Sequence, residues 1–73
     1  MDFILDEDWA IEVKAKTTLS SGDFKGMLAL KEEGLCSRYS IVYLGEHRQK
    51  YENGVEALPY FEFIKEVYKD LHL

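Results

Sequence analysis

The sequence lacks the features on which small secreted and membrane proteins depend. Its 73 residues include one cysteine, Cys36, and one proline, Pro59. A single cysteine excludes an internal disulfide framework and a thiolate metal cluster. It fits a reducing compartment, so we expect a cytoplasmic protein. No apolar run approaches the roughly 20 residues of a membrane span, and no signal peptide is visible, so we expect no membrane association.

Positive charge is scarce as well. Nine Lys and Arg against 14 Asp and Glu give a net charge of −5, which provides no general attraction to nucleic acid. The loop pattern G-x-x-x-x-G-K-[ST] of P-loop ATPases is absent. A hydrophobic content of 47% is typical of a globular domain. The length allows one small domain, residues 1–73.

Two short segments at the start of the chain, 2–5 and 10–15, are typical of β-strands. Successive side chains on a strand point to opposite faces, so Glu12 and Lys14 share a face that Ile11 does not. A carboxylate and an ammonium on an otherwise apolar strand are costly unless solvent or a ligand compensates for them. A functional site is therefore expected at this strand.

The connection between the two strands sets their register. A three-residue hairpin loop over residues 6–8 would place Asp2 opposite Glu12. A shift by one residue would place Phe3 there and mix the polar and apolar faces, which a half-buried sheet disfavours. A shift by two residues keeps the faces and places Asp2 opposite Lys14, so this register stays open. Two opposed carboxylates either raise one pKa or bind a cation such as Mg²⁺.

The rest of the chain predicts a helix, a strand, a weaker strand and a second helix. Ser20 and Asp23 have the spacing of a helix N-cap, and the helix is expected to run over 20–33 and stop at Gly34. A buried strand is expected over 39–44. The Asn53-Gly54 pair predicts a tight turn and an edge strand or small hairpin within 50–58.

The final helix is expected from Pro59 to the end of the chain. Five apolar residues recur there at helical spacing: Phe61, Ile64, Val67, Tyr68 and Leu71. Four of them make one stripe: Phe61, Ile64, Tyr68 and Leu71. They predict a core stripe, or a homodimer face if the domain is truncated. The order strand, strand, helix, strand, weak strand, helix predicts the α/β class, a small mixed sheet flanked by helices.

Several of these residues together resemble a known superfamily. Asp2, then Glu12-Val13-Lys14, a helix and a hydrophobic strand resemble the PD-(D/E)XK nucleases, which have the restriction-endonuclease-like fold. Longer stretches resemble the C-terminal domain, of unknown function, of a family of predicted AAA+ ATPases: 10–16, 23–30, 41–45 and 54–60.

The resemblance implies roles for four residues. Asp2 and Glu12 would hold Mg²⁺, helped by the backbone carbonyl of Val13, and Lys14 would orient the attacking water. A fixed ammonium there would also offset the charge that develops on the phosphate. Nucleic acid is the implied partner of an active nuclease, and the ATPase domain of the parent chain is the implied partner otherwise.

The core of the superfamily usually begins with a helix and a strand that do not fit before Asp2. We therefore expect residues 1–73 to be a truncated core, a C-terminal fragment of a larger ATPase. The expected function is a degenerate nuclease-like domain with a recognition or regulatory role. Two alternatives stay open: a Mg²⁺-dependent nuclease, and a structural or oligomerisation fragment.

Other candidate residues carry weaker signals. Lys16, Lys25 and Arg38 could form a phosphate-facing patch beside Lys14, or could be ordinary solvated side chains. Three aromatic residues could stack on bases, although core or interface packing is the commoner role: Trp9, Tyr60 and Phe63. His47 and His72 are expected to be surface histidines without ligand spacing, and Cys36, which has no evident base partner, is expected to be a passive thiol.

Overall fold

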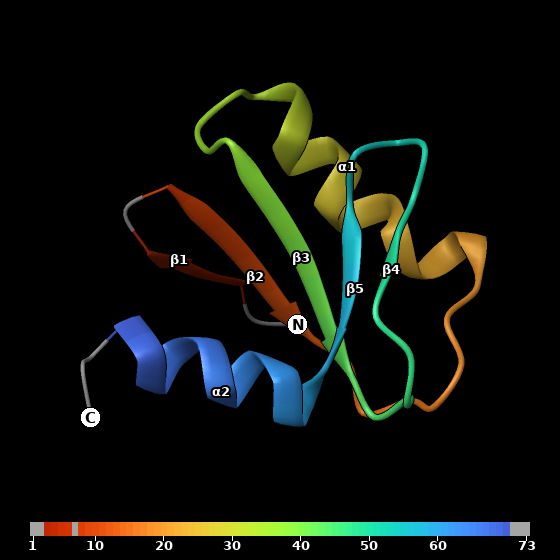
Figure 1. Cartoon of the computed structure of the whole chain (residues 1–73). Coiled ribbons are helices and arrows are strands. Elements are labelled where there is room, and N and C mark those ends of the chain that lie inside the picture. Colours follow the sequence, from red (N-terminus) through yellow and green to blue (C-terminus); the bar gives the residue numbers. More distant parts are fainter. Residues whose placement is uncertain (1–2, 7, 71–73) are drawn as a thin grey trace.

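The protein is a small α/β domain with one mixed sheet between two helices (Figure 1). The computed structural model describes residues 3–6 and 8–70, and the side chains of 8–69. Its elements are β1 (Phe3–Asp6), β2 (Trp9–Val13), the 3-10 helix η1 (Ser21–Phe24), α1 (Lys25–Glu32), β3 (Arg38–Tyr43), β4 (Gln49–Lys50), β5 (Glu56–Pro59) and α2 (Tyr60–Asp70). The predicted α/β class and the small mixed sheet with flanking helices are confirmed.

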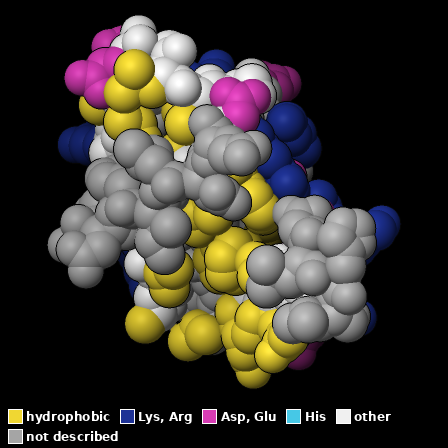
Figure 2. Space-filling view, turned by 90° about the vertical axis from the view of Figure 1, so that its left-hand side faces the viewer, with side chains coloured by type: hydrophobic (Ala, Val, Ile, Leu, Met, Phe, Trp, Pro, Cys, Tyr) yellow, Lys and Arg dark blue, Asp and Glu magenta, His cyan; other side chains and the backbone are white. Residues whose placement is uncertain are grey.

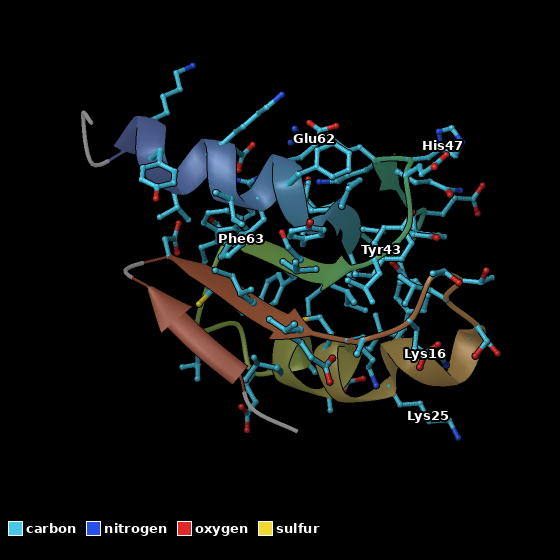
Figure 3. All side chains as sticks on the ribbon, turned by 90° about the horizontal axis from the view of Figure 1, so that it is seen from below. Lys16, Lys25, Tyr43, His47, Glu62 and Phe63 are labelled. Atoms are coloured by element: carbon cyan, nitrogen blue, oxygen red, sulfur yellow. The ribbon has the colours of Figure 1, made fainter. Side chains whose placement is uncertain are left out.

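The five strands lie in the order β1-β2-β3-β5-β4. The three inner strands run parallel, and the two outer ones are antiparallel to their neighbours. The segment with η1 and α1 connects β2 to the parallel β3, which is the usual crossover between parallel neighbours. Seen from below, α1 and α2 lie on opposite faces of the sheet (Figure 3).

The register of the first hairpin differs from the prediction. Glu12 pairs with Phe3, and Asp6 pairs with Trp9, so the strands lie one residue away from the predicted register. The prediction assumed a sheet with one apolar and one polar face. In the structure β2 is covered on both faces, and all its residues from Trp9 to Glu12 are buried. Alternation of side chains therefore does not select the register.

The segment over 50–58 is also more central than predicted. It forms a hairpin, as expected, but only the two-residue β4 lies at the edge. Strand β5 pairs with β3 on its other side, and all four of its residues are buried. Pro59 is the last residue of β5, where it pairs with Tyr43, and α2 begins one residue later.

Each face of the sheet has its own hydrophobic core. The cluster beneath α1 consists of Ala10, Phe24, Met27, Tyr39, Ile41 and Val55. The cluster beneath α2 consists of Trp9, Ile11, Val42 and Leu58, with Phe63 of α2 packed against it. Because β2 and β3 contribute to both clusters, a run of apolar residues without alternation is what their position requires.

The helix predicted over 20–33 is present, with a tighter first turn. The backbone N–H of Ser20 donates to the carboxylate of Asp23 at 2.8 Å, and the N–H of Asp23 donates to the carbonyl of Ser20 at 3.0 Å. This arrangement satisfies amide groups that the start of a helix leaves free. At the other end, Gly34 adopts a φ of 69° and its N–H donates to the carbonyl of Lys31.

The exposed side of α2 includes three of the residues that were predicted to form either a core stripe or a homodimer face. Phe61, Ile64 and Tyr68 are 42–54% exposed, so they are not core residues. Phe63 instead faces the sheet and packs edge-on against Trp9, with ring centroids 5.7 Å apart. Leu71, the fourth residue of the predicted stripe, lies outside the described residues. The helix is amphipathic as predicted, but its inward face is a different one.

The loop between β4 and β5 depends on a glycine. The N–H of Gly54 donates to the carbonyl of Tyr51, and the N–H of Tyr51 donates to the carbonyl of Val55. Residues 52–54 thus form a three-residue hairpin loop in which Gly54 has a φ of 89°. A Cβ there would also lie within 3 Å of the Lys31 side chain.

We predict that Gly54→Ala lowers the free energy of unfolding by about 1–2 kcal/mol, because a side chain disfavours the left-handed region. Urea denaturation followed by circular dichroism measures this change. The matched control is Gly22→Ala in η1, where an added Cβ meets no atom within 4 Å and φ is not positive. Equal stabilities of the two variants would contradict the prediction.

Candidate functional site

Strand β2 directs Glu12 and Lys14 to the face of the sheet that α1 covers. Ala10 belongs to the core beneath α1, and residues two and four positions further along the strand share its face. Beyond the end of β2 the chain stays aligned with β3. The N–H of Lys14 donates to the carbonyl of Val42, and the N–H of Leu44 donates to the carbonyl of Lys16, both at 2.8 Å. These bonds fix the backbone at Lys14 and Lys16, from which the two lysine side chains project.

Four charged side chains meet there: Glu12, Lys14, Lys16 and Asp23, which we call the acid–lysine cluster. The Lys14 Nζ atom lies 3.7 Å from Oε2 of Glu12 and 3.6 Å from Oδ1 of Asp23. The ammonium of Lys16 donates to both carboxylate oxygens of Asp23, at 2.9 and 2.8 Å. Two acids and two lysines therefore neutralise each other inside the cluster.

Glu12 is the unusual member of the cluster. Its side chain has no solvent exposure, and neither carboxylate oxygen has a hydrogen-bond partner in the described part of the chain. At 3.7 Å the Lys14 ammonium attracts the carboxylate but is too distant for a hydrogen bond. Burial raises the pKa of Glu12 above its ordinary value, and the attraction of Lys14 offsets only part of that effect.

Asp23 is stabilised as a carboxylate. The hydrogen bonds from Lys16 and from the backbone N–H of Ser20 hold the pKa of Asp23 well below its ordinary range. A hydroxyl contact from Ser20 adds to this, at 3.2 Å. Asp23 thus remains ionised at all but strongly acidic pH, and it contributes a permanent negative charge to the cluster.

The structure places the residues that were predicted for the site as follows. Glu12 and Lys14 share one face and lie close together, as predicted. Asp2 lies outside the described residues. Val13, between the two, is at the end of β2 with a side chain that is 56% exposed.

Sequence reasoning missed Asp23, which it assigned to the helix cap alone. The signal that could have revealed it is its position on the crossover from β2 to β3. A crossover covers the sheet that it connects, so its first turn lies near the end of β2 and therefore near Lys14. The capping pattern explained Asp23 locally and concealed its contact with the strand.

Lys16, Lys25 and Arg38 do not form the phosphate-facing patch that was one of the two alternatives for them. Lys16 is bound to Asp23. Lys25 is exposed and points away from the body of the molecule (Figure 3). Arg38 contacts Trp9, Glu56 and Glu66, all on the α2 side of the sheet. The three cations therefore cannot converge on one ligand.

Arg38 instead organises a second polar group, beneath α2. Its guanidinium lies 3.9 Å above the Trp9 ring and donates to Glu56 at 2.6 Å. Ser40 accepts a hydrogen bond from the Trp9 indole at 2.7 Å and donates to Glu56 at 2.6 Å. Burial alone would raise the pKa of Glu56, but the bonds from Ser40 and Arg38 lower it. This satisfied network has a structural role.

The structure places the other candidates on different parts of the fold. Trp9 is a core residue, as the commoner alternative predicted, and Tyr60 is half exposed on α2. His47 lies in the exposed segment between β3 and β4 and points outward (Figure 3). Cys36 is a free, partly buried thiol. His72 lies outside the described residues.

An apolar surface remains exposed on α2. Hydrophobic side chains gather in the lower part of the face shown in Figure 2, where α2 runs in Figure 1. A shallow groove of about 320 Å³ there is lined by Phe63, Ile64, Val67 and Tyr68. The α2 groove is lined by apolar side chains, as a surface that accepts another protein would be.

The chain matches no family model, no curated protein and no solved structure. Within residues 3–6 and 8–70, no helix is both long enough and apolar enough to cross a membrane. Over the same residues, no three His, Cys, Asp or Glu side chains are grouped to hold a metal ion. The acid–lysine cluster, which contains two carboxylates, is the candidate functional site of the described structure.

We predict that wild type gains stability over Glu12→Gln as the pH falls from about 7 to 4.5. The pKa of Glu12 is raised above 4.5 in the folded chain, so the folded chain takes up this proton more readily than the unfolded chain. Urea denaturation at several pH values measures the difference. Glu56→Gln is the control: because the pKa of Glu56 is lowered, wild type keeps its advantage over that variant down to about pH 4.5 and loses it only as the pH falls further. Parallel pH profiles for wild type and Glu12→Gln would contradict the prediction.

We also predict that Asp23→Asn melts at a lower temperature than wild type at neutral pH. Because the pKa of Asp23 is depressed from 3.8, its stabilising effect is complete above that pH and is lost as the pH falls further. The difference in melting temperature should therefore shrink in acid. Glu32→Gln removes an exposed carboxylate from α1 and serves as the control. A difference that persists undiminished in strong acid would argue against the assignment.

Proposed function

We propose that this chain is a degenerate nuclease-like domain that recognises or regulates rather than cuts, working with an AAA+ ATPase domain. Its sequence resemblance to the C-terminal domain of such ATPases supports this assignment. So does the placement of Glu12 and Lys14 on one face of β2, followed by a helical crossover to the parallel β3. That arrangement suits a nuclease-like site, although fold alone does not establish activity.

The observation that carries the proposal is the position of the Lys14 ammonium between two carboxylates. In metal-dependent phosphodiester hydrolysis, such a lysine would have to face the attacking water or the phosphate. Here it lies 3.7 Å from Glu12 and 3.6 Å from Asp23, so its charge is already engaged. Glu12 has no solvent exposure through which a nucleic-acid phosphate could approach.

Electrostatics favour the same conclusion. Affinity for nucleic acid comes largely from lysines and arginines that neutralise phosphates. Both lysines of the acid–lysine cluster are paired with Asp23, and the net charge of the chain is −5. A protein partner suits this surface better, and the α2 groove offers it apolar area. We assign that partner to the ATPase domain.

A Mg²⁺-dependent nuclease is the second candidate, and one observation favours it. A buried carboxylate without a hydrogen-bond partner is rare, because its burial is costly unless a cation or donor compensates for it. Among the described residues, Glu12 is such a group. Mg²⁺ commonly takes one or two carboxylates and keeps several waters, so Glu12 and Asp2 would be its protein ligands in this candidate, together with the carbonyl of Val13.

A cleavage assay separates the two candidates. The chain is incubated with plasmid DNA and with single-stranded RNA in millimolar Mg²⁺ or Mn²⁺, beside Glu12→Gln and Lys14→Ala prepared identically. We expect no metal-dependent cleavage by wild type beyond that of the two variants. Cleavage that requires metal and disappears in both variants would establish the nuclease and overturn the degenerate assignment.

A further inference from the structure

Strand β1 forms one edge of the sheet. It is the first strand in the order β1-β2-β3-β5-β4, and among the described residues only β2 pairs with it. Alternate residues of an antiparallel strand direct their N–H and C=O groups toward the neighbouring strand, and the others direct them outward. Strand β1 therefore presents main-chain donors and acceptors with which an extended segment of another protein can pair. The opposite edge consists of the two-residue β4, which is too short to offer the same pairing.

The α2 groove lies on the same side of the molecule as the β1 edge. Glu66 of α2 reaches Arg38 of β3, whereas Phe63, which lines the groove, reaches Trp9 of β2. Strand β1 is the next strand in this direction, about 4.8 Å beyond β2. Figure 1 draws β1 and the C-terminal half of α2 on the same side, and Figure 2, which looks at that side, shows hydrophobic side chains gathered in its lower part.

The groove supplies apolar contacts that an added strand would need. Its volume is about 320 Å³, and two of its lining side chains, Ile64 and Tyr68, are 42% and 54% exposed. In strand addition, main-chain hydrogen bonds provide affinity, and pockets beside the edge accept every second side chain. An edge strand next to an apolar groove is the combination that this mode of binding uses.

The acids around β1 indicate the charge of the occupant. Residues 2–8 contain four acids and no lysine or arginine: Asp2, Asp6, Glu7 and Asp8. Lysine or arginine on either side of an apolar segment would be attracted to this acidic stretch. A second copy of the chain would bring the same acids to the edge, where like charges opposed across strands are destabilising. The charge therefore favours a basic partner over a homodimer.

We propose that the β1 edge and the α2 groove together bind, by strand addition, an extended apolar segment that is flanked by lysine or arginine. The segment extends the sheet beside β1, and every second side chain faces α2. The inference rests on the proposed function in assigning this segment to the AAA+ ATPase domain. It deepens that function by naming the kind of segment that is recognised.

Peptide binding tests the proposal. The probe is a synthetic peptide in which three valines alternate with threonines between pairs of lysines, and it is titrated into residues 1–73 by calorimetry. We expect saturable binding, with slower hydrogen exchange of the backbone amides of β1 (Phe3–Asp6) in the complex. A peptide with glutamates in place of the lysines should bind about tenfold or more weakly. A peptide N-methylated at alternate residues cannot complete the main-chain pairing and should not bind.

Ile64 and Phe61 provide matched variants on α2. Both side chains are 42% exposed, but Ile64 lines the groove and Phe61 does not. Ile64→Ser should weaken binding of the lysine-flanked peptide about tenfold or more, because it removes apolar contact area. Phe61→Ser should leave the affinity unchanged. Circular dichroism checks that each variant is folded, and Tyr68→Ser, at a more exposed position in the groove, replaces Ile64→Ser if that variant unfolds.

Several results would overturn the proposal. They are absence of saturable binding by the lysine-flanked peptide, equal affinity for the glutamate-flanked or N-methylated peptide, and equal effects of the groove variant and Phe61→Ser. A dimer detected by light scattering, with β1 amides protected in the absence of peptide, would also overturn it, because a second copy would then occupy the edge. Cleavage of nucleic acid by wild type would overturn only the proposed function, and the peptide titrations would still decide this inference.

Discussion

Coverage of the sheet on both faces is the constraint on which the structure depends. With α1 on one side and α2 on the other, the inner strands bury most of their side chains on both faces. A charge on these strands must therefore find its counterion within the fold. Both buried glutamates have such a counterion: Lys14 lies near Glu12 on one face, and Arg38 binds Glu56 on the other.

The two buried glutamates differ in how completely their carboxylates are hydrogen-bonded. Glu56 receives short hydrogen bonds from Ser40 and Arg38, so its burial is compensated by direct donors. From the part of the chain that the structure describes, Glu12 receives none, and the nearby Lys14 ammonium balances its charge. Completely satisfied buried groups are usually structural, whereas strained or perturbed ones cluster at functional sites. This contrast between equivalent acids on opposite faces of one sheet directs attention to Glu12.

Local sequence patterns predicted the helices and strands well, but they did not predict how distant segments pair and pack. The cap at Ser20, the stop at Gly34 and the buried strand β3 were evident from neighbouring residues. The register of β1 was not evident from neighbouring residues, because the alternation used to predict it assumes a sheet with one solvent-exposed face. The inward face of α2 was also misassigned, since Phe61 and Phe63 are equally apolar and only the tertiary structure separates them.

The candidate site shows the same division. Glu12 and Lys14 could be placed on one face because alternation along a strand is a local rule. Asp23 could not be added to them, since its contact with Lys14 depends on how the crossover returns over β2. Sequence reasoning thus found the half of the cluster that lies on one strand, and the fold supplied the other carboxylate.

The strand order has a consequence for the way in which this chain reaches its folded state. The strand pairs that are close in sequence, β1 with β2 and β4 with β5, lie toward the edges of the sheet. Its centre requires Trp9 to meet Arg38 and Ser40 to meet Glu56, across long intervening segments. Closing such loops costs entropy before the core forms, which slows folding relative to helical proteins of similar size. Until then the apolar inner strands stay unpaired, so the folding chain is exposed to aggregation at its most hydrophobic segments.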